Sequence, residues 1–337
     1  MRFVHLVIPD LFLPRDFAAE VLAALSLPAL EKMLGRGQSE ILDPDSLEGL
    51  LCKSFDIPLR GDAPIAAVSA AFDGLAAGYW LRADPVHLRL QRDQMLMLPV
   101  TEISANEAEQ MCVSLNGHFS GQGMEFFAPH PQRWYVRLDS LPDIRTSPAS
   151  QVTGRDVRRA LPTGADAAHW HRIFNEIQML LFAHPFNEYR DERGELTINS
   201  VWLWGTGHSE NASPQKNYGH VSSDEVMVEM LAGAAGIPFS PWPGQWQNAK
   251  SEGGQLLVWT GLRSALQGGD LAAWRNALQD FENGFAQPLW QALRDGKITQ
   301  IKLDILSGDA VRQIILTRGD AWSFWRRARH LAEYSLV

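Results

Sequence analysis

The sequence has few cysteines, no excess of positive charge and no long apolar run. Cys52 and Cys112 are its only cysteines, which excludes a disulfide framework and makes a reducing cytoplasm the expected location. The formal net charge of -9 argues against a general nucleic-acid-binding protein, because such a protein needs basic surface to neutralise phosphates. No apolar run approaches the roughly 20 residues of a membrane span, so no membrane association is expected.

Several common catalytic motifs are missing as well. The chain has no Walker A loop, no Gly-x-Gly-x-x-Gly after a strand, no His-Glu-x-x-His, no Cys-x-x-Cys pair and no Gly-x-Ser-x-Gly elbow. His169 and His171 are two residues apart on an expected helix, so they face different ways and are poor joint metal ligands.

What the sequence does contain is the pattern of an α/β protein large enough for two domains. Its 337 residues are 45% hydrophobic and 20% charged. Short apolar or alternating runs predict strands at 3–8, 86–90, 95–98, 123–127, 133–138, 199–204, 255–260, 299–306 and 310–317. Helical spacing predicts helices at 27–35, 46–55, 63–79, 106–119, 166–183, 226–235 and 270–294, the first with Gly35 as its C-cap.

This order of elements predicts the domain organisation. Strands that alternate with helices favour a sheet core flanked by helices, and the strand-rich stretch after Trp80 favours an inserted α+β lobe. We expect the lobe, with its exit helix, at 81–196 and a discontinuous core at 1–80 and 197–337. Two connections between lobe and core favour a hinge.

The most specific motifs lie between Asn175 and Gly207, with one earlier segment. They are Arg82-Ala-Asp84, Asn175-Glu176, His184-Pro-x-Asn187-x-x-Arg190, and Asn199 at the start of a strand that ends in Gly205-x-Gly207. Together and in this order they resemble the archaeal-type cofactor-independent phosphoglycerate mutases, metalloenzymes of the alkaline phosphatase superfamily. The resemblance implies an alkaline-phosphatase-like core with an inserted lobe.

The resemblance also implies a chemistry whose positions can be checked. The superfamily uses two divalent metals, such as manganese or zinc, and a serine or threonine nucleophile. Asp10, at the end of the first predicted strand, fits the first metal ligand, although the family's following glycine is absent. The nucleophile position aligns with Asp45, and a one-residue slip would give it to Ser46. As an alternative, Ser46 is simply a helix N-cap.

The later positions of the family's pattern are mostly changed. Gly269-Asp270 survives, but Arg263 and Gln267 lie near where the family has aspartate and histidine, and an arginine there would repel a dication. Asp304 and Asp309 are available for a later pair, but 302–316 has no histidine. The final histidine has no match, and the lobe's Asp-Thr-Asp-Pro reads Arg-Thr-Ser-Pro at 145–148. We therefore expect no cofactor, with the two metals as the alternative.

The retained residues have two interpretations. In the first they form a pocket between core and lobe, where Arg82 and Arg190 bind a small anionic ligand. In the second they are structural, with Asn187 and Asn199 bonded to backbone groups and Arg190 paired with Asp84 or a helix C-terminus. The retained residues are Asp10, Arg82, Asp84, His184, Asn187, Arg190, Asn199, Gly205 and Gly207.

A second resemblance comes from tryptophan-rich motifs. Trp-Leu-Trp-Gly-x-Gly at 202–207, Asp-x-x-x-Trp-Arg at 270–275 and Asp-Ala-Trp-Ser-Phe-Trp-Arg-Arg at 320–327 are similar to a bacterial family labelled RpfE-type regulatory proteins. The aromatic residues beside Arg326 and Arg327 predict either a docking surface for a protein partner or the closure of a core.

Two functional hypotheses follow. One is a non-catalytic relative of the mutases that acts in regulation, through a small anionic ligand or a protein partner. The other is a working mutase or phosphatase with rearranged metal ligands.

Overall fold

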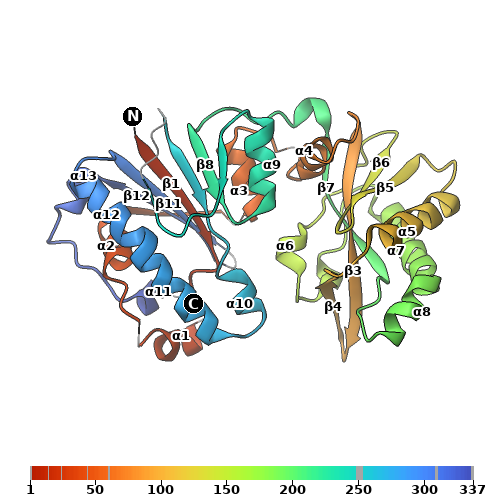
Figure 1. Ribbon diagram of the computed structural model, residues 1–337, viewed down its shortest axis with the longest axis horizontal. Coiled ribbons are helices and arrows are strands. Elements are labelled where there is room, and N and C mark those ends of the chain that lie inside the picture. Colours follow the sequence, from red (N-terminus) through yellow and green to blue (C-terminus); the bar gives the residue numbers. More distant parts are fainter. Residues whose placement is uncertain are drawn as a thin grey trace. The chain divides into compact units, whose positions relative to one another are not determined.

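The computed structural model describes residues 2–13, 15–23, 25–43, 45–59, 61–247, 253–307 and 310–334. The chain divides into two compact units. The first comprises Met1–Leu47 and Lys216–Val337, and the second comprises Glu48–Gln215. Each unit has its own sheet, as predicted for a mixed α/β protein with an insertion (Figure 1).

The described part of the first unit contains a seven-stranded sheet in the order β2-β12-β11-β1-β10-β8-β9. Its strands are β1 (Phe3–Pro9), β2 (Gln38–Leu42), β8 (His220–Ser223), β9 (Phe239–Pro241), β10 (Gln255–Val258), β11 (Gln300–Ser307) and β12 (Ala310–Thr317). β1 is parallel to β10 and β11 and lies at the centre, as predicted. β11 and β12 are antiparallel, which confirms the predicted pairing, while the turn residues 308–309 lie outside the described residues.

Helices cover this sheet. They are α1 (Arg15–Leu22), α2 (Pro28–Arg36), α9 (Val226–Ala234), α10 (Arg263–Gln267), α11 (Leu271–Phe281), α12 (Gln287–Arg294) and α13 (Arg318–Ala321). The helix predicted at 270–294 is one helical run, in which a π-helical turn, Glu282–Ala286, joins α11 to α12 (Figure 1). The prediction of Gly35 as the C-cap was wrong. The helix runs to Arg36 and Gly37 is the cap, because the Gly37 N–H still reaches the carbonyl of Met33.

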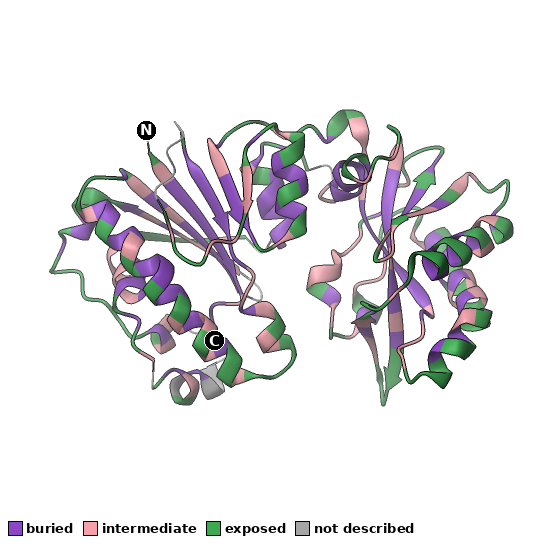
Figure 2. Cartoon of the chain, viewed as in Figure 1, coloured by how far each residue is buried: buried purple, intermediate pink, exposed green. Residues whose placement is uncertain are grey.

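One face of β1 forms the core of this unit. Val4, Leu6 and Ile8 alternate along the strand and pack in the same cluster as Trp274 and Leu278 of α11. Figure 2 shows the central strands as almost entirely buried. An apolar run with both neighbours in the sheet and a helix over its face is typical of a central parallel strand.

The second unit has a sheet in the order β4-β3-β6-β5, with β7 pairing to β3 as well. Its strands are β3 (Tyr79–Gln91), β4 (Gln94–Pro99), β5 (Met124–His130), β6 (Arg133–Leu138) and β7 (Ser200–His208). The helices of this part of the chain are α3 (Leu47–Ser54), α4 (Ile65–Phe72), α5 (Ala105–His118), α6 (Ala149–Val152), α7 (Ala167–Phe182) and α8 (Pro185–Glu192).

The second unit takes in more of the chain than the lobe expected at 81–196. Residues 48–80 and 197–215 belong to it too, because β7 pairs with β3 from Ser200 to His208 and α4 lies against β7. The single helix predicted at 63–79 was wrong. It ends at Phe72, before Asp73 and the left-handed Gly74 (φ 82°), and β3 begins at Tyr79.

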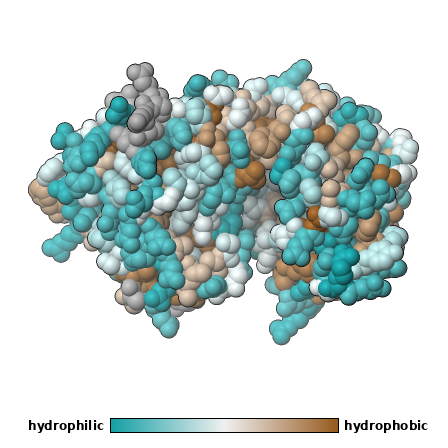
Figure 3. All heavy atoms as spheres, in the orientation of Figure 1, coloured by the Kyte–Doolittle hydropathy of each residue, from teal (hydrophilic) through white to brown (hydrophobic). Residues whose placement is uncertain are grey.

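The surface agrees with the composition. Across the described residues, no helix is both long and apolar enough to cross a membrane. Figure 3 shows hydrophilic side chains over most of the visible face, with apolar ones in small separate groups.

Candidate functional site

The carboxyl ends of β1, β10 and β8 meet at one edge of the first unit's sheet, because these strands are parallel. Asp10 follows β1, and its Oδ2 accepts a bond from Nε of Arg263, the first residue of α10, at 3.1 Å. Asp224 follows β8, and both its carboxylate oxygens accept the N–H of Thr260, at 2.8 and 3.1 Å. Ligands of open α/β sheets bind at this edge. Here the carboxylates of Asp10 and Asp224 already accept hydrogen bonds from other residues of the chain.

Asp304 lies inside the sheet, opposite Val7 of β1. It is fully buried and accepts bonds from Nε2 of His5 at 2.7 Å and from Nε2 of Gln313 at 2.9 Å, with Nζ of Lys302 at 3.2 Å. Burial alone would raise the pKa of Asp304, but the bond from His5 and the charge of Lys302 outweigh it and hold the pKa below its ordinary value.

His5 completes this buried network. Since Nε2–H donates to Asp304, Nδ1 carries no proton and accepts the hydroxyl of Tyr218 at 2.8 Å. Burial lowers the pKa of His5 despite the carboxylate beside it, so the imidazole is neutral. The negative charge of Asp304 is therefore balanced by Lys302.

These carboxylates do not fit the two-metal site that the fold family implies. Asp10 already holds a guanidinium, and both oxygens of Asp304 accept hydrogen bonds from other side chains. Among the residues that the structure describes, no group of three or more His, Cys, Asp or Glu side chains could hold a metal ion. Asp309 lies outside the described residues.

The two candidate nucleophile residues precede α3. The N–H of Ser46 donates to Oδ1 of Asp45 at 2.8 Å. This bond joins adjacent residues and is not the bond of a helix cap, which reaches the N–H two or three residues further on. Both residues lie in the first unit, as Asp10 does.

In the second unit, Arg82 and Asp84 form an ion pair on β3. Nε and Nη2 of Arg82 donate to Oδ1 of Asp84 at 3.0 and 2.5 Å. The guanidinium lies between two aromatic rings, 5.2 Å from the centroid of Tyr135 and 5.4 Å from that of Trp204. Trp204 donates from Nε1 to Oδ2 of Asp84 at 2.7 Å. The charge of Arg82 is thus compensated within the sheet.

A second carboxylate, Asp62, connects the segments around this pair. It accepts the N–H and hydroxyl of Thr146 and the hydroxyl of Thr206, the last at 3.2 Å. Burial raises the pKa of Asp62 even though these bonds act in the opposite direction. The N–H of Gly205 donates to Oγ1 of Thr146 at 3.0 Å. Asp62 therefore holds the loop at 145–148, where this chain has Arg-Thr-Ser-Pro in place of Asp-Thr-Asp-Pro.

The two glycines allow α4 to approach β7. A Cβ on Gly207 would lie 2.7 Å from Cβ of Pro64, and Gly205 has φ 73°, a left-handed value. Close packing against α4 and the left-handed backbone therefore explain why these two positions are glycines.

The His-Pro-x-Asn-x-x-Arg cluster starts a helix that the sequence analysis did not predict. His184 is the N-cap of α8, and its Nδ1 accepts the N–H of Phe186 at 3.3 Å. Asn187 donates to the carbonyls of Leu181 and Ile198 at 2.7 and 2.9 Å and accepts the N–H of Ile198 at 2.8 Å. Asn187 thus ties the end of α7 to the segment that leads into β7.

Arg190 is buried and paired, but not with Asp84. Its Nη1 donates to Oε1 of Glu107 at 3.0 Å and its Nε donates to the carbonyl of Leu196 at 2.7 Å. The side-chain amide of Asn199 makes two hydrogen bonds with the backbone of Leu88. It accepts the N–H of Leu88 at 2.7 Å and donates to the carbonyl of Leu88 at 2.9 Å. These contacts match the structural interpretation, with Glu107 as the partner in place of Asp84.

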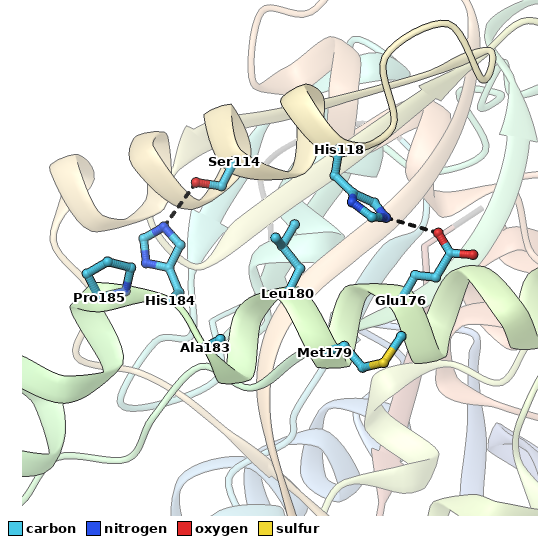
Figure 4. Close-up of a pocket in the computed structure, with 8 residues that line it drawn as sticks. All are labelled: Ser114, His118, Glu176, Met179, Leu180, Ala183, His184 and Pro185. Atoms are coloured by element: carbon cyan, nitrogen blue, oxygen red, sulfur yellow. Dashed lines mark hydrogen bonds and ion pairs between the residues drawn. The ribbon is translucent and has the colours of Figure 1, made fainter.

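A groove of about 430 Å³ lies between α5 and α7, and His184 lines it (Figure 4). On one side, Nε2 of His118 lies 3.0 Å from Oε2 of Glu176, within hydrogen-bond distance. On the other, Nε2 of His184 lies 3.1 Å from Oγ of Ser114 (Figure 4). The floor between them is apolar, formed by Leu180 and Ala183.

The Ser114–His184 pair is not a nucleophile and its base. Because Nδ1 of His184 accepts the N–H of Phe186, the neutral ring carries its proton on Nε2 and donates it to the serine. Burial lowers the pKa of His184, which favours this neutral form. The Ser114 hydroxyl in turn donates to the carbonyl of Gln110 at 3.1 Å, so no base is positioned to take its proton.

The structure thus divides the predicted residues between the two units. Asp10 lies at the sheet edge of the first unit, and Arg82, Asp84, His184, Asn187, Arg190, Asn199, Gly205 and Gly207 lie in the second. Sequence analysis missed His5, Tyr218, Asp62 and Glu107. His5 and Glu107 interrupt apolar positions of a strand and a helix, which is a usable signal for buried polar groups. Their partners are distant in sequence and carry no local signal.

Comparison with known proteins finds a similarity to the same family. The family model described as 2,3-bisphosphoglycerate-independent phosphoglycerate mutase matches residues 56–187, which all lie in the second unit. A protein of that name from Methanosarcina mazei is 25% identical over 224 residues, 63% of this chain and 56% of the relative. One from Methanosarcina acetivorans is 24% identical over 245 residues, 66% of this chain and 60% of the relative.

Solved structures extend the likeness to nearly the whole chain. A cofactor-independent phosphoglycerate mutase from Thermoplasma acidophilum matches 99% of this chain and 94% of its own, with a TM-score of 0.51 and 16% identity. The PH0037 protein from Pyrococcus horikoshii matches 98% of this chain and 92% of its own, with a TM-score of 0.55 and 15% identity. The chain is similar to cofactor-independent phosphoglycerate mutases, and its fold is the predicted alkaline-phosphatase-like one. In sequence it spans less than two thirds of the length of the curated relatives.

Proposed function

We propose that this chain is a non-catalytic, phosphoglycerate-mutase-like protein with a regulatory or ligand-binding role. The observation that carries the proposal is the ion pair between Asp10 and Arg263, at the position where the family resemblance expects the first metal ligand. The RpfE-type regulatory label, a bacterial source, a cytoplasmic location and the absence of a metal cofactor are parts of the same proposal.

The ion pair supports the proposal through electrostatics. A metal bound to Asp10 would have to displace the Arg263 guanidinium and remain near it. Like unit charges 4 Å apart repel by about 4 kcal/mol near a protein surface, and a dication doubles the product of the charges. Asp304 offers no substitute, because it is buried and its oxygens are bonded to His5 and Gln313.

The ligand of such a protein would be a small anionic molecule or a protein partner, with no nucleic acid and no membrane. Arg82 is compensated by Asp84, and Arg190 by Glu107, so neither supports an anion site by an excess of charge. The pocket predicted between core and lobe stays a prediction. Arg327 and Arg329, which line a pocket of the first unit, support anion binding more strongly.

The alternative is a metal-dependent phosphoglycerate mutase or phosphatase with rearranged ligands. The observation that favours it is the similarity to proteins named 2,3-bisphosphoglycerate-independent phosphoglycerate mutase. The matched family model covers residues 56–187 and so leaves Asp10, Arg263 and Asp304 outside.

Metal analysis of the purified chain tests the proposal. After incubation with manganese or zinc and gel filtration, we expect no stoichiometric metal, and no mutase or phosphatase activity with 3-phosphoglycerate or a generic phosphate ester. Arg263→Leu serves as the comparison, because it frees Asp10 from its partner without adding a ligand atom. Two equivalents of metal in the unaltered chain, lost together with activity in Asp10→Asn, would overturn the proposal in favour of the alternative.

A further inference from the structure

The last described part of the chain forms a pocket in the first unit. Residues 325–334 lie against the end of α2 and the start of β2 and enclose about 650 Å³ with them. The lining includes Gly35, Trp325, Arg326, Arg327, Arg329 and Tyr334. The pocket lies wholly within the first unit and is separate from Asp10 and Arg263.

Reciprocal bonds hold this segment in place. Nη1 of Arg36, at the end of α2, donates to the carbonyl of Ala321 at 2.9 Å, and Nη1 of Arg326 donates to the carbonyl of Arg36 at 2.7 Å. Gly35 allows the backbone to come close, because a Cβ there would lie 2.7 Å from the carbonyl oxygen of Arg327. The segment therefore has a defined path, and the arginines on it have defined positions.

The charges in the pocket are not balanced. Arg326 lies 3.2 Å from Asp320, but within the described chain the side chains of Arg327 and Arg329 make no hydrogen bond or ion pair with another residue. Glu333 is the acidic residue of the lining, and its Oε1 accepts the N–H of His330 at 3.3 Å. The lining therefore holds two guanidinium groups that have no acidic partner in the described residues, in a chain of net charge -9. Guanidinium groups bind phosphate oxygens in a two-pronged geometry.

An exposed aromatic residue lies beside these arginines. Trp325 lines the pocket with 74% of its surface exposed, and its neighbour Phe324 is 69% exposed. The two rings meet edge to face at 6.2 Å, and the large exposed fraction of the Trp325 indole leaves it accessible to another planar group. Stacking on an aromatic side chain is how proteins hold bases without base-specific hydrogen bonds.

The size of the pocket narrows the class of ligand. A volume of about 650 Å³ is within the range of about 300–1,000 Å³ for small-molecule sites, and it far exceeds what a bare phosphate ion fills. We propose that this pocket binds a small phosphorylated molecule with a planar ring, of the size of a mononucleotide. Arg327 and Arg329 bind its phosphate, and Trp325 stacks on its ring. The site does not depend on whether the chain is catalytic.

Binding of defined probes to the full chain tests the proposal. Adenosine and guanosine mono- and triphosphates are titrated by calorimetry and by tryptophan fluorescence, beside inorganic phosphate and adenosine. We expect one nucleotide to bind more tightly than either phosphate or adenosine alone. The double variant Arg327→Gln/Arg329→Gln should weaken that binding by about tenfold or more, since two charge-assisted bonds are lost. Trp325→Ala should weaken nucleotide binding and leave phosphate binding unchanged.

A matched control separates the site from net charge. Arg155→Gln/Arg172→Gln removes two exposed positive charges in the second unit, and we expect it to bind as the unaltered chain does. Thermal unfolding of each variant checks that it is folded. The proposal is overturned if no nucleotide binds, if inorganic phosphate binds as tightly as the best nucleotide, or if the control weakens binding as much as the double variant does. A failure here leaves the metal measurement on Asp10 unaffected.

Discussion

Arg263 donates to Asp10 from the first turn of α10, and Asp10 accepts this bond from a left-handed backbone conformation with φ 62°. The N–H of Asp10 also continues the pairing of β1 with β11 by donating to the carbonyl of Leu306 at 3.0 Å. The residue after the central strand is therefore fixed by backbone and side chain together. A positive φ is uncommon for a residue with a side chain, and aspartate tolerates it better than most.

Substitution of Asp10 should separate the backbone conformation from the ion pair. We expect Asp10→Ala to be less stable than Asp10→Gly by about 1 kcal/mol, because alanine is strained at this φ and glycine is not. Both variants lose the same bond to Arg263. Urea unfolding of the two proteins measures the difference, and equal midpoints would contradict the left-handed conformation at Asp10.

Removal of Arg190 should strongly destabilise the second unit. Its side chain is 1% exposed, and Arg190→Met leaves the buried carboxylate of Glu107 and the carbonyl of Leu196 without this donor. Breaking a buried pair from one side costs about 3–5 kcal/mol, and we expect the lower end because Ser104 also donates to Glu107. Chemical denaturation followed by circular dichroism measures the loss.

Arg193→Met is the matched control for this measurement. Arg193 lies 3.6 Å from the same Glu107 oxygen, but its side chain is half exposed and it pairs with Glu195 at the surface. We expect little change in the free energy of unfolding, since exposed pairs contribute little. If both variants lose the same stability, burial is not what distinguishes Arg190.

The sequence carries much of the fold because its elements have strong local signals. The apolar run at 3–8, the hairpin strands 299–306 and 310–317, and the helix at 106–119 all appear where patterning predicts them. Pro185 gave no such clear signal. A proline commonly follows the end of a helix, but it is also the favoured first residue of a helix, and here His184 serves as the cap of α8.

The candidate site was less predictable, because its chemistry depends on partners that are distant in sequence. Asp10 and Arg263 are 253 residues apart, and Arg190 and Glu107 are 83 apart. A sequence motif shows which residues are present, but it does not show which residue each side chain forms a hydrogen bond or an ion pair with. The resemblance therefore indicated Arg82 and Arg190 as anion-binding residues, whereas the structure shows each bonded to a carboxylate of its own unit.

Stability should fall as the pH drops below about 6.5, and His184 should account for part of the fall. Burial lowers the pKa of His184, so the folded chain binds fewer protons at this site than the unfolded chain. Its contribution is thus complete above the ordinary histidine pKa and is lost as the pH falls from there. We expect the difference in unfolding free energy between pH 7.5 and 5.5 to shrink in His184→Asn.

The asparagine variant is chosen because it keeps an N-cap acceptor for the N–H of Phe186. His5 also has a pKa lowered by burial, and it is present in both proteins, so its effect cancels in the comparison. An identical pH dependence in the two proteins would show that His184 is not held neutral by burial.

Asn187 should be needed for the junction between α7 and β7. Asn187→Ala leaves the N–H and the carbonyl of Ile198 without these bonds, whereas the carbonyl of Leu181 still accepts the N–H of His184. Each unpaired buried group costs about 1–3 kcal/mol, so we expect a loss of about 2 kcal/mol or more. Asn187→Asp keeps the acceptor for Ile198 but not the donors, so it should also be destabilised. Amide hydrogen exchange should show the loss of protection first at Ile198.

Two glycine substitutions in helices should have opposite effects on stability. At Gly35 of α2 an added Cβ would meet the carbonyl oxygen of Arg327 at 2.7 Å and Cα of Ala328 at 3.0 Å. Gly35→Ala must therefore displace residues 325–334, the arginine segment. We expect a loss of about 1–2 kcal/mol, because overpacking outweighs the gain in helix propensity. At Gly233 of α9 nothing lies within 4 Å of an added Cβ, so Gly233→Ala should gain about 0.5–1 kcal/mol.

The glycine pair also tests the position of the arginine segment. If residues 325–334 lie against α2, Gly35→Ala should increase proteolysis near Arg327 and Arg329, whereas Gly233→Ala should leave it unchanged. Limited trypsin digestion with mass spectrometry measures both. Because the arginines reach the pocket only while the segment keeps its path, Gly35→Ala should weaken nucleotide binding as well. Stabilisation by Gly35→Ala, with unaltered digestion, would show that the segment does not lie on this helix.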